Sequence, residues 1–181
     1  DMASSFRMLR SNSLIWHYFD RSYLFGEPLP PIDVLFWNTD TTRMPAAMHS
    51  FYLREMYLNN NLIRRDALTI AGEPIDLDRI TQPLYAVGAE DDHIVPWRQS
   101  YKIRRYVNIK APVRYVLTTS GHIFGIVNAV VTPPRRSFWV AAPERNESNE
   151  HWLARADRKA GSWWEDWLDW LSPQCGPLVA P

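Results

Sequence analysis

The first third of the chain carries two helical patterns separated by a short apolar run. Residues 6–25 place apolar side chains among polar ones in a pattern that suits one or two short helices better than a strand. A proline-rich segment ends this unit, because proline cannot continue a helix. Residues 34–37 are apolar, with β-branched and aromatic side chains, which predicts a buried strand. Thr41 or Thr42 is placed to cap a further helix that continues to about Leu58.

Two short apolar runs in the middle of the chain, residues 84–87 and 113–118, have the length and composition of buried strands. The first follows Pro83 and stops at Gly88, and residues 96–107 between the runs show a helical pattern. Strand, helix and strand within about 35 residues is the size of a βαβ unit, whose right-handed crossover makes the strands parallel. Because parallel strands end at the same edge of a sheet, we expect the polar loops that follow them to lie together.

Two segments show no clear periodicity. Residues 59–82 are mixed and mostly polar, with turns expected at Gly72 and Pro74. Residues 132–150 are rich in Pro, Arg, Asn and Glu, and we predict a surface loop there.

The last predicted element is a tryptophan-rich helix. Ser162-Trp163-Trp164-Glu165 has the pattern of a capping box, which places the start of a helix at this point. We expect its apolar face to pack against the sheet, and contact with another apolar surface or a partner is the alternative. That face consists of Trp163, Trp164, Trp167, Leu168, Trp170 and Leu171.

Composition and charge describe a folded protein without a general affinity for polyanions. Hydrophobic residues make up 46% and aromatic residues 13% of the 181 positions, which is too apolar for a disordered chain. The 20 basic residues balance 20 acidic ones, so we expect neither nucleic acid nor an anionic membrane as a partner. Apolar stretches such as residues 123–131 are too short to span a bilayer, and residues 1–20 lack the layout of a signal peptide. We therefore expect a cytoplasmic protein without a membrane span.

Cys175 is the one cysteine of the sequence. A single cysteine forms no intramolecular disulfide, and we expect no cysteine-based metal site. It lies in residues 173–181, a tail that contains Pro and Gly, where an inert thiol is the expected role.

Two side chains with acid–base chemistry follow the two predicted strands. Asp92 comes shortly after residues 84–87, and His122 shortly after residues 113–118. Ligands of open α/β sheets gather at the carboxyl ends of the strands, and a hydrolase triad has the chain order nucleophile, acid, base. A carboxylate that accepts an imidazole N–H fixes the tautomer and stabilises the imidazolium that forms when the other nitrogen takes up a proton. Asp92 and His122 are therefore the candidate acid and base of a catalytic triad.

Order and position alone leave structural roles open for both residues. A single Asp after a strand often caps a helix or forms a turn, and a single His is often a satisfied structural residue. The sequence contains no nucleophile elbow of the form Gly-x-Ser-x-Gly, nor its cysteine variant. The one pair of glycines at that spacing, Gly121 and Gly125, brackets His122 instead.

Other polar residues close to Asp92 have weaker claims. His93 could orient substrate or the acid loop, and a turn-stabilising role is the alternative. Arg98, Lys102 and Arg105 form a basic stripe at helical spacing. The stripe could meet an anionic substrate, but we favour a solvated helix face.

Five segments of the chain match a known family in combination. They are Arg10-Ser11-Asn12, Phe36-Trp37-Asn38-Thr39-Asp40, Asp92-His93-Ile94-Val95-Pro96-Trp97, Ser120-Gly121-His122-Ile123 and Gly161-Ser162-Trp163-Trp164. With them the chain resembles the C-terminal part of the catalytic domain of polyhydroxyalkanoate (poly-3-hydroxybutyrate) synthases, and it is most like class I. The family commonly has a glutamate where this chain has Asp91, so the choice of Asp92 rests on the His93-Ile94 that follows.

The resemblance implies a fold and a division of the chain. The fold class is α/β, as the C-terminal portion of an α/β-hydrolase fold with late parallel strands and flanking helices, preceded by part of a cap subdomain. Residues 1–31 would belong to the cap, residues 32–172 to the catalytic core and residues 173–181 to a tail.

The resemblance also implies an activity. The family's enzymes are acyltransferases that polymerise (R)-3-hydroxyacyl-CoA into polyhydroxyalkanoate through a cysteine thioester and release CoA. Coenzyme A is then part of the substrate, with no further cofactor and no metal. The implied partners are the growing polyester chain, a second copy in a homodimer and the surface of a cytoplasmic polyester granule. Neither the family's cysteine elbow nor its oxyanion-hole segment has a counterpart in this sequence, so we expect the isolated chain to be inactive.

Residue roles follow by the same resemblance. Asp92 and His122 match the family's catalytic aspartate and histidine, and His122 would deprotonate the cysteine, since the thiolate is the nucleophile. Asp92 would support His122 or help to activate the 3-hydroxyl of the incoming unit, and both roles stay open. Trp37 matches a tryptophan near the active site, Arg10 lies in a segment suited to CoA phosphates, and His93 is a further substrate-binding candidate.

Two other functions are compatible with the same residues. A related esterase or polyester depolymerase would carry serine in the elbow. A non-catalytic module would bind synthase subunits or polyester granules through an aromatic surface.

Overall fold

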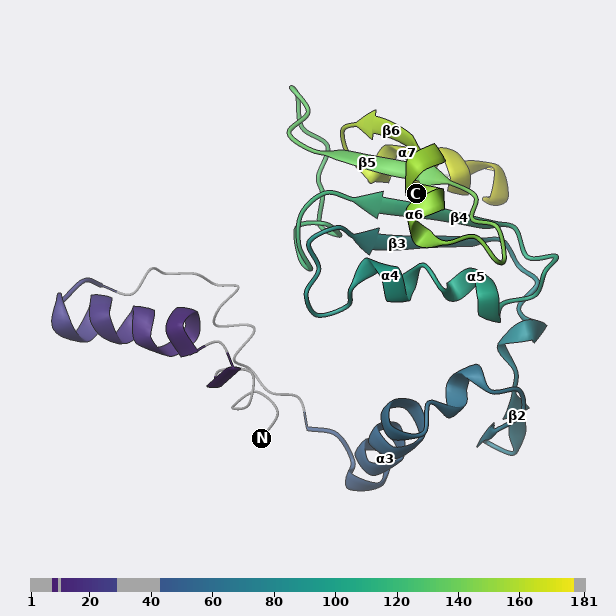
Figure 1. The fold of residues 1–181 in the computed structure, drawn as a ribbon, viewed down its shortest axis with the longest axis horizontal. Coiled ribbons are helices and arrows are strands. Elements are labelled where there is room, and N and C mark those ends of the chain that lie inside the picture. The colour runs from purple at the N-terminus through teal and green to yellow at the C-terminus, as the bar shows by residue number, and fades with distance from the viewer. Residues whose placement is uncertain (1–7, 10, 29–42, 178–181) are drawn as a thin grey trace. The chain divides into compact units, whose positions relative to one another are not determined.

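The chain folds into two compact units, residues 1–48 and 49–181. The computed structural model describes residues 8, 9, 11–28 and 43–177 (Figure 1).

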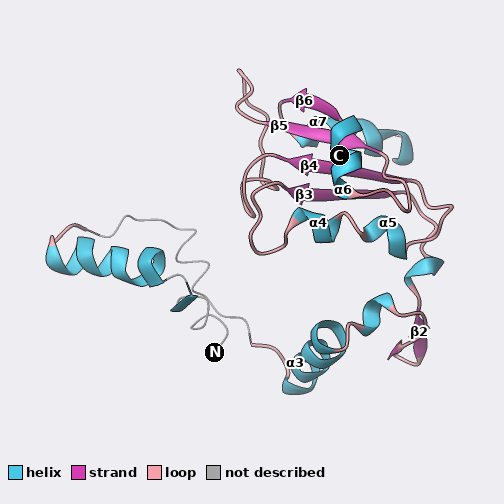
Figure 2. Cartoon of the chain, in the orientation of Figure 1, coloured by secondary structure: helices cyan, strands magenta, loops and turns pink. Residues whose placement is uncertain are grey.

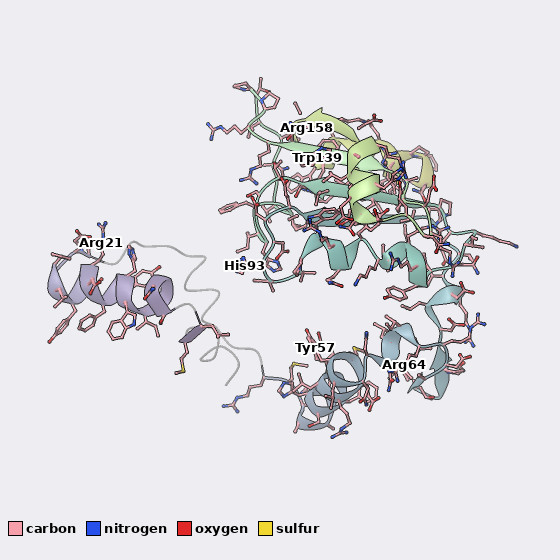
Figure 3. All side chains as sticks on the ribbon, in the orientation of Figure 1. Arg21, Tyr57, Arg64, His93, Trp139 and Arg158 are labelled. Carbon is pink, nitrogen blue, oxygen red and sulfur yellow. The ribbon has the colours of Figure 1, made fainter. Side chains whose placement is uncertain are left out.

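The described part of the first unit is largely helical. Its two helices have π-type hydrogen bonds that reach five residues back, as from the N–H of His17 to the carbonyl of Asn12. Arg21 forms an ion pair with Glu27 at 2.9 Å near the end of the segment (Figure 3). The helices predicted within residues 6–25 are confirmed as η1 (Asn12–Trp16) and η2 (Phe19–Leu24). The strand predicted at residues 34–37 lies outside the described residues.

The next helix begins later than predicted. Its expected caps were Thr41 or Thr42, but the first helical residue is Ala46, directly after Pro45. A proline pushes the preceding residue out of the helical region, which explains the delay. The helix then continues as predicted, as α3 (Ala46–Phe51) and the π-helical η3 (Tyr52–Leu58).

Residues 59–82 contain a small hairpin. Ala71 and Gly72 form its two-residue turn with φ values of 52° and 86°, the left-handed values of a type I′ turn. Pro74 marks no turn, contrary to our prediction, because it lies in a strand opposite Thr69. The hydrogen-bonded pair adjoins the turn, so Pro74 stands where no N–H is needed. The strands are β1 (Leu68–Ile70) and β2 (Glu73–Ile75), with η4 (Asn61–Ile63) before them and η5 (Leu77–Arg79) after them.

A mixed four-stranded sheet forms the core of the second unit (Figure 2). The first two strands are parallel, with Leu84 opposite Val113, as the βαβ length predicted. The other two strands, which were not predicted, each pair antiparallel, so the sheet is mixed. The order is β3 (Leu84–Ala89), β4 (Val113–Thr118), β5 (Ser137–Ala141) and β6 (Asp157–Ala160).

The strand β5 lies where we predicted a surface loop, within residues 132–150. Phe138 and Val140 are buried, whereas Ser137 and Trp139 are half-buried, which is the alternation of a strand covered mainly on one face. The same segment also holds the start of α6 (Asn149–Arg155). Arg158 of β6 lies over the ring of Trp139, with its guanidinium carbon 5.1 Å from the ring centre (Figure 3).

The strand β3 runs to Ala89, two residues beyond Val87, the last residue of the predicted run. Gly88 is a site of close packing, because a Cβ there would lie 2.2 Å from the hydroxyl oxygen of Tyr115 and 2.9 Å from Oγ of Ser100. The sequence suggested only that the strand stops at this glycine, but its absent side chain makes room for Tyr115 and for α4.

Residues 96–107 form two short helices instead of the single predicted one, α4 (Trp97–Ser100) and α5 (Ile103–Tyr106). Between them the N–H of Lys102 bonds to Gln99 and the N–H of Arg105 bonds to Lys102, each three residues back. Such bonds tighten the chain into a turn. The ring of Tyr101 at this turn packs edge-on against Tyr115, with ring centres 5.2 Å apart.

Helices cover both faces of the sheet. Successive residues of β4 point to opposite faces, so Leu117 packs with Trp97 and Trp152 on the side of α4 and α6. Val116 packs on the other side with the half-buried Trp163 of α7 (Trp163–Leu171). The short η6 (Ser172–Gln174) follows α7.

The helix α7 begins at the predicted cap, where Oγ of Ser162 accepts the N–H of Trp164 at 3.1 Å. Buried Asp166 binds the helix to the sheet, because it accepts hydrogen bonds from Arg114 at 2.8 and 2.5 Å and from the hydroxyl of Tyr85 at 2.9 Å. Burial raises the pKa of Asp166, but these bonds outweigh it and hold that pKa below its ordinary value. The predicted packing face is only partly covered, since Trp167 and Leu168 are exposed.

Candidate active site

The two candidate residues lie on adjacent loops at the carboxyl end of the parallel strands. Asp92 follows β3 and His122 follows β4. Main-chain bonds join the loops, from the N–H of Glu90 to the carbonyl of Thr118 at 2.8 Å and from the N–H of Asp91 to the carbonyl of Ser120 at 3.1 Å. The parallel pairing therefore continues past the strands and aligns the two loops.

The carboxylate of Asp92 accepts hydrogen bonds on both oxygens. Oδ1 accepts the N–H groups of Ile94 and Val95, each at 2.8 Å. Oδ2 lies 2.8 Å from Nδ1 of His122. The Asp92 side chain is 8% exposed and that of His122 is 45% exposed. The structure thus brings together the two residues that sequence order suggested, with the carboxylate enclosed and the imidazole accessible.

These contacts set the charge of Asp92. Burial raises the pKa of its carboxyl, but the hydrogen bonds from Val95, His122 and Ile94 outweigh burial and lower that pKa below its ordinary value. Asp92 is therefore an anion at neutral pH. An anion beside Nδ1 favours the tautomer that carries its proton there, which leaves Nε2 as a proton acceptor. The pair is suited to general acid–base chemistry.

The His122 loop, residues 121–128, is pressed closely against the sheet. Ser120 just before it has a φ of 89°, which residues with a side chain rarely adopt. A Cβ on Gly125 would lie 2.5 Å from Cβ of Ala89 and 2.8 Å from the carbonyl oxygen of Gly121. The glycine pair around His122 therefore has a steric role, because a side chain at position 125 would lift the loop from β3.

The remaining predicted site residues are placed differently. His93 is exposed on the loop between β3 and α4 (Figure 3). Arg10 and Trp37 lie outside the described residues. In the basic stripe, Arg98 faces Glu150 at 3.5 Å and Lys102 donates to the side chain of Gln99 at 2.6 Å, as expected of a solvated helix face.

Exposed apolar side chains flank Asp92 and His122 along the two loops, and we call them the apolar rim. Surface clusters of this kind commonly mark a contact with another protein segment or a ligand. The rim comes from the two loops and comprises Ile94, Val95, Ile123, Phe124, Ile126 and Val127, each exposed by 42–63%.

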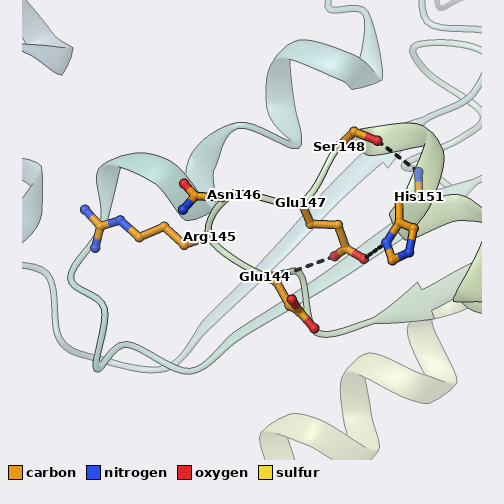
Figure 4. A pocket seen from close by; sticks show the side chains of 6 residues that line it. All are labelled: Glu144, Arg145, Asn146, Glu147, Ser148 and His151. Carbon is orange, nitrogen blue, oxygen red and sulfur yellow. Dashed lines mark hydrogen bonds and ion pairs between the residues drawn. The ribbon is translucent and has the colours of Figure 1, made fainter.

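A second carboxylate–imidazole pair was not anticipated. Oε1 of Glu147 lies 2.8 Å from Nδ1 of His151 at the start of α6 (Figure 4). The available signal was the spacing of four residues, which makes neighbours on a helix. An open depression of about 480 Å³ adjoins the pair, lined by Glu144, Arg145, Asn146, Glu147, Ser148 and His151.

Glu147 has more partners than Asp92. Its side chain is 2% exposed and accepts two hydrogen bonds from Arg155, at 2.5 and 2.6 Å, and one from the hydroxyl of Tyr101 at 3.2 Å. The bonds from Arg155 are the main cause that lowers the pKa of Glu147 to about 2, against the opposing effect of burial.

The described residues contain neither a candidate metal site nor a membrane-spanning helix. No three His, Cys, Asp or Glu side chains among them are grouped so that they could hold a metal ion. Within the same residues, every helix is too short or too polar to cross a membrane.

Comparisons with known proteins point to one family of enzymes. The chain is 42% identical over 181 residues to the poly(3-hydroxyalkanoate) polymerase subunit PhaC of Cupriavidus necator, and the match covers 97% of this chain and 29% of that protein. It is 38% identical to poly(3-hydroxyalkanoate) polymerase 2 of Ectopseudomonas oleovorans, over 100% of this chain and 31% of that protein. It is 41% identical to subunit PhaC of Rhizobium etli, over 99% of this chain and 27% of that protein.

These relatives confirm the resemblance that the five sequence segments carried. The chain spans less than a third of the length of the curated relatives it matches. No protein-family model matches it.

Proposed function

We propose that this chain is the C-terminal part of the catalytic domain of a poly(3-hydroxyalkanoate) polymerase and that Asp92 and His122 supply the acid and base of its triad. The observation that carries the proposal is the 2.8 Å contact between Oδ2 of Asp92 and Nδ1 of His122 at the carboxyl edge of a parallel strand pair. In an α/β-hydrolase fold the acid and base occupy loops of this kind. The similarity to the polymerases supplies the reaction class.

The proposed reaction begins with proton transfer to His122. Nε2 takes the proton of a cysteine thiol outside this chain, and the thiolate attacks the thioester carbonyl of (R)-3-hydroxyacyl-CoA. The bond to the CoA sulfur breaks, the acyl group stays on the cysteine, and His122 returns the proton to the departing CoA. Asp92 stabilises the imidazolium between these steps. In elongation, the hydroxyl of one unit attacks the thioester carbonyl of another. The ester bond forms, the carbon–sulfur bond of that thioester breaks, and His122 passes the hydroxyl proton to the departing thiolate.

The other predicted residues take binding roles in this proposal. Arg10 would contact the CoA phosphates, Trp37 would line the site, and His93 would contact the substrate from the acid loop. Residues 1–31 form part of a cap and residues 32–172 the end of the catalytic core. The assembly is a homodimer at the surface of a cytoplasmic polyester granule.

Two features support the idea that the rest of a polymerase completes this site. In the described sheet β3 is an edge strand, so a further strand can pair with its free side. The apolar rim flanks Asp92 and His122, and covering it would remove water from the reacting groups. We expect a strand from the rest of the polymerase to pair with β3, and the cysteine elbow to lie over the apolar rim.

A chimaera tests the proposal. This chain replaces the matching segment of the Cupriavidus necator polymerase, and the purified protein receives (R)-3-hydroxybutyryl-CoA. We expect both free CoA and polymer. A folded chimaera that releases CoA and free hydroxy acid without polymer would point to an esterase or depolymerase instead. A folded chimaera that binds polyester granules but releases no CoA would support the non-catalytic module.

A further inference from the structure

Side chains from two other segments hold the main chain of the His122 loop. Oγ of Ser162 donates to the carbonyl of Asn128, Nε1 of Trp163 donates to Gly125 at 3.0 Å, and Nε1 of Trp164 donates to Ile126 at 3.1 Å. Arg136 donates to the carbonyl of Phe124, and its guanidinium lies over the ring of Phe124. Three consecutive residues at the start of α7 thus bind three carbonyls of the loop that carries His122.

The loop has few other anchors. Gly125 and Asn128 are buried, but the side chains at Ile123, Phe124 and Val127 are more than half exposed, so packing holds only part of the loop. Its internal bonds include those from the N–H of Gly125 to Gly121 and from the N–H of Val127 to Ile123, each at 2.8 Å. A segment with exposed side chains and few bonds opens easily unless something outside it supplies the restraint.

The donors themselves are fixed to the strands that position the pair. Ser162 is 3% exposed and uses its hydroxyl twice, since the oxygen also accepts the N–H of Trp164. The ring of Trp163 stacks on Tyr85 of β3 with ring centres 6.0 Å apart. Asp166, one turn further along α7, is bonded to Arg114 of β4. The start of α7 therefore connects both strands to the His122 loop.

We infer that Ser162, Trp163 and Trp164 are positioning residues for His122. They touch neither His122 nor Asp92 and act through the loop carbonyls, which fix the backbone that carries the imidazole. With the backbone fixed, Nδ1 stays at 2.8 Å from Asp92 and Nε2 keeps its direction toward the nucleophile. Naming His122 the base rests on the proposed function, whereas the positioning itself does not.

The test removes indole N–H groups while keeping aromatic rings. The double variant Trp163→Phe, Trp164→Phe loses two donors to the loop. Trp167→Phe is the matched control on the same helix, because no hydrogen bond of its indole to a described residue is found. Trp152→Phe is a structural control, since it removes an indole bond to Ala141 in the core, away from the loop.

The measurement is nuclear magnetic resonance of the 181-residue chain, with the exchange of the His122 Nδ1 proton and of the Gly125 and Val127 amides with water as readouts. We expect the double variant to exchange these protons on the order of tenfold faster, because each lost hydrogen bond shifts local opening severalfold. Trp167→Phe should change them by less than about twofold. Trp152→Phe should lower overall stability and leave exchange at the loop no faster than exchange elsewhere in the sheet.

An unchanged His122 proton in a folded double variant would overturn the inference, and so would an equal change in Trp167→Phe. If the double variant does not fold, Trp164→Phe alone removes the more exposed bond, and about threefold faster exchange at the loop is expected. None of these exchange measurements needs polymerase activity. In the chimaera the double variant should lower kcat on the order of tenfold with KM nearly unchanged. Faster exchange in a chimaera that makes no polymer would leave the positioning intact and count against the proposed function.

Discussion

Two carboxylate–imidazole pairs of this molecule share one geometry and differ in everything around it. Asp92 with His122 and Glu147 with His151 each place a carboxylate oxygen 2.8 Å from Nδ1. Both carboxylates are enclosed, at 8% and 2% exposure, and both imidazoles are accessible. Distance and burial alone therefore do not separate a candidate catalytic pair from a structural one.

The counter-charge is what separates them. Arg155 binds Glu147 through two hydrogen bonds and balances its charge. No lysine or arginine in the described part of the chain lies within ion-pair distance of Asp92, whose other bonds come from main-chain N–H groups. No cation among these residues balances the charge of Asp92, so this charge acts on His122. The charge of Glu147 instead binds Arg155 in the last turn of α6. The position agrees, because only the first pair lies at the carboxyl end of parallel strands.

The largest effect expected is the complete absence of turnover in the isolated chain. The sequence contains no nucleophile elbow that could act with either pair. The elbow would also supply an oxyanion donor, because one donor is the N–H of the residue after the nucleophile. Purified chain mixed with (R)-3-hydroxybutyryl-CoA should release no CoA above the uncatalysed rate. Release that disappears in Asp92→Ala or His122→Ala would contradict the account.

Removing a carboxylate should affect stability at the second pair far more than at the first. Glu147→Gln strands the charge of Arg155 and breaks several bonds, so we expect a loss of roughly 3 kcal/mol, the lower end of the range for buried pairs. Asp92→Asn should cost about 1 kcal/mol, since two main-chain bonds can persist. Urea unfolding of both variants measures the difference. Equal losses would remove the distinction between the pairs.

The same contrast should appear in the acid limb of stability. The pKa of Glu147 is lowered from 4.5 to about 2, so its contribution is complete above about pH 4.5 and is lost as pH falls toward 2. We expect a loss on the order of 2 kcal/mol over this window in the native chain. Glu147→Gln should flatten that dependence. If the variant and the native chain lose stability in parallel, Glu147 is not the titrating group.

The smallest effect expected is that of His151→Ala. Its side chain is 75% exposed and its pair has the i, i+4 spacing of a helix surface. Such pairs contribute about 0–1 kcal/mol, so the free energy of unfolding should fall by less than about 1 kcal/mol. Thermal unfolding at neutral pH is sufficient to test this. A larger loss would mean that His151 is part of the buried network.

Sequence patterns predicted the elements in which burial or helix capping restricts the residue types. The apolar runs of β3 and β4 and the cap at Ser162 are readable because burial and capping restrict residue types. The meeting of Asp92 and His122 followed from the parallel order of the two strands. The segments around Asp92 and His122 then indicated the enzyme family, which the spacing of apolar residues does not reveal.

The features that the sequence patterns missed depend on main-chain hydrogen bonds or on contacts between residues far apart in the chain. The four residues of β6, Asp157–Ala160, are all exposed, so no apolar run marks the strand, and main-chain pairing joins it to β5. The strand β5 was missed because it lies within a segment rich in Pro, Arg, Asn and Glu, a composition that predicts a loop. Nothing in the sequence marks Gly88 and Gly125 as sites of close packing, yet Tyr115 and Ala89 occupy the space of their missing side chains. Only tertiary structure shows those neighbours.

The most direct test of the central claim compares the two histidines in the active chimaera. CoA release from (R)-3-hydroxybutyryl-CoA is measured for His122→Gln and His151→Gln at equal concentrations of folded protein. We predict that His122→Gln lowers kcat by about 10²–10⁴-fold, the contribution typical of a general base, and that His151→Gln stays within about twofold of the parent. A His122→Gln chimaera that retains the parent's rate would contradict the assignment of the Asp92–His122 pair.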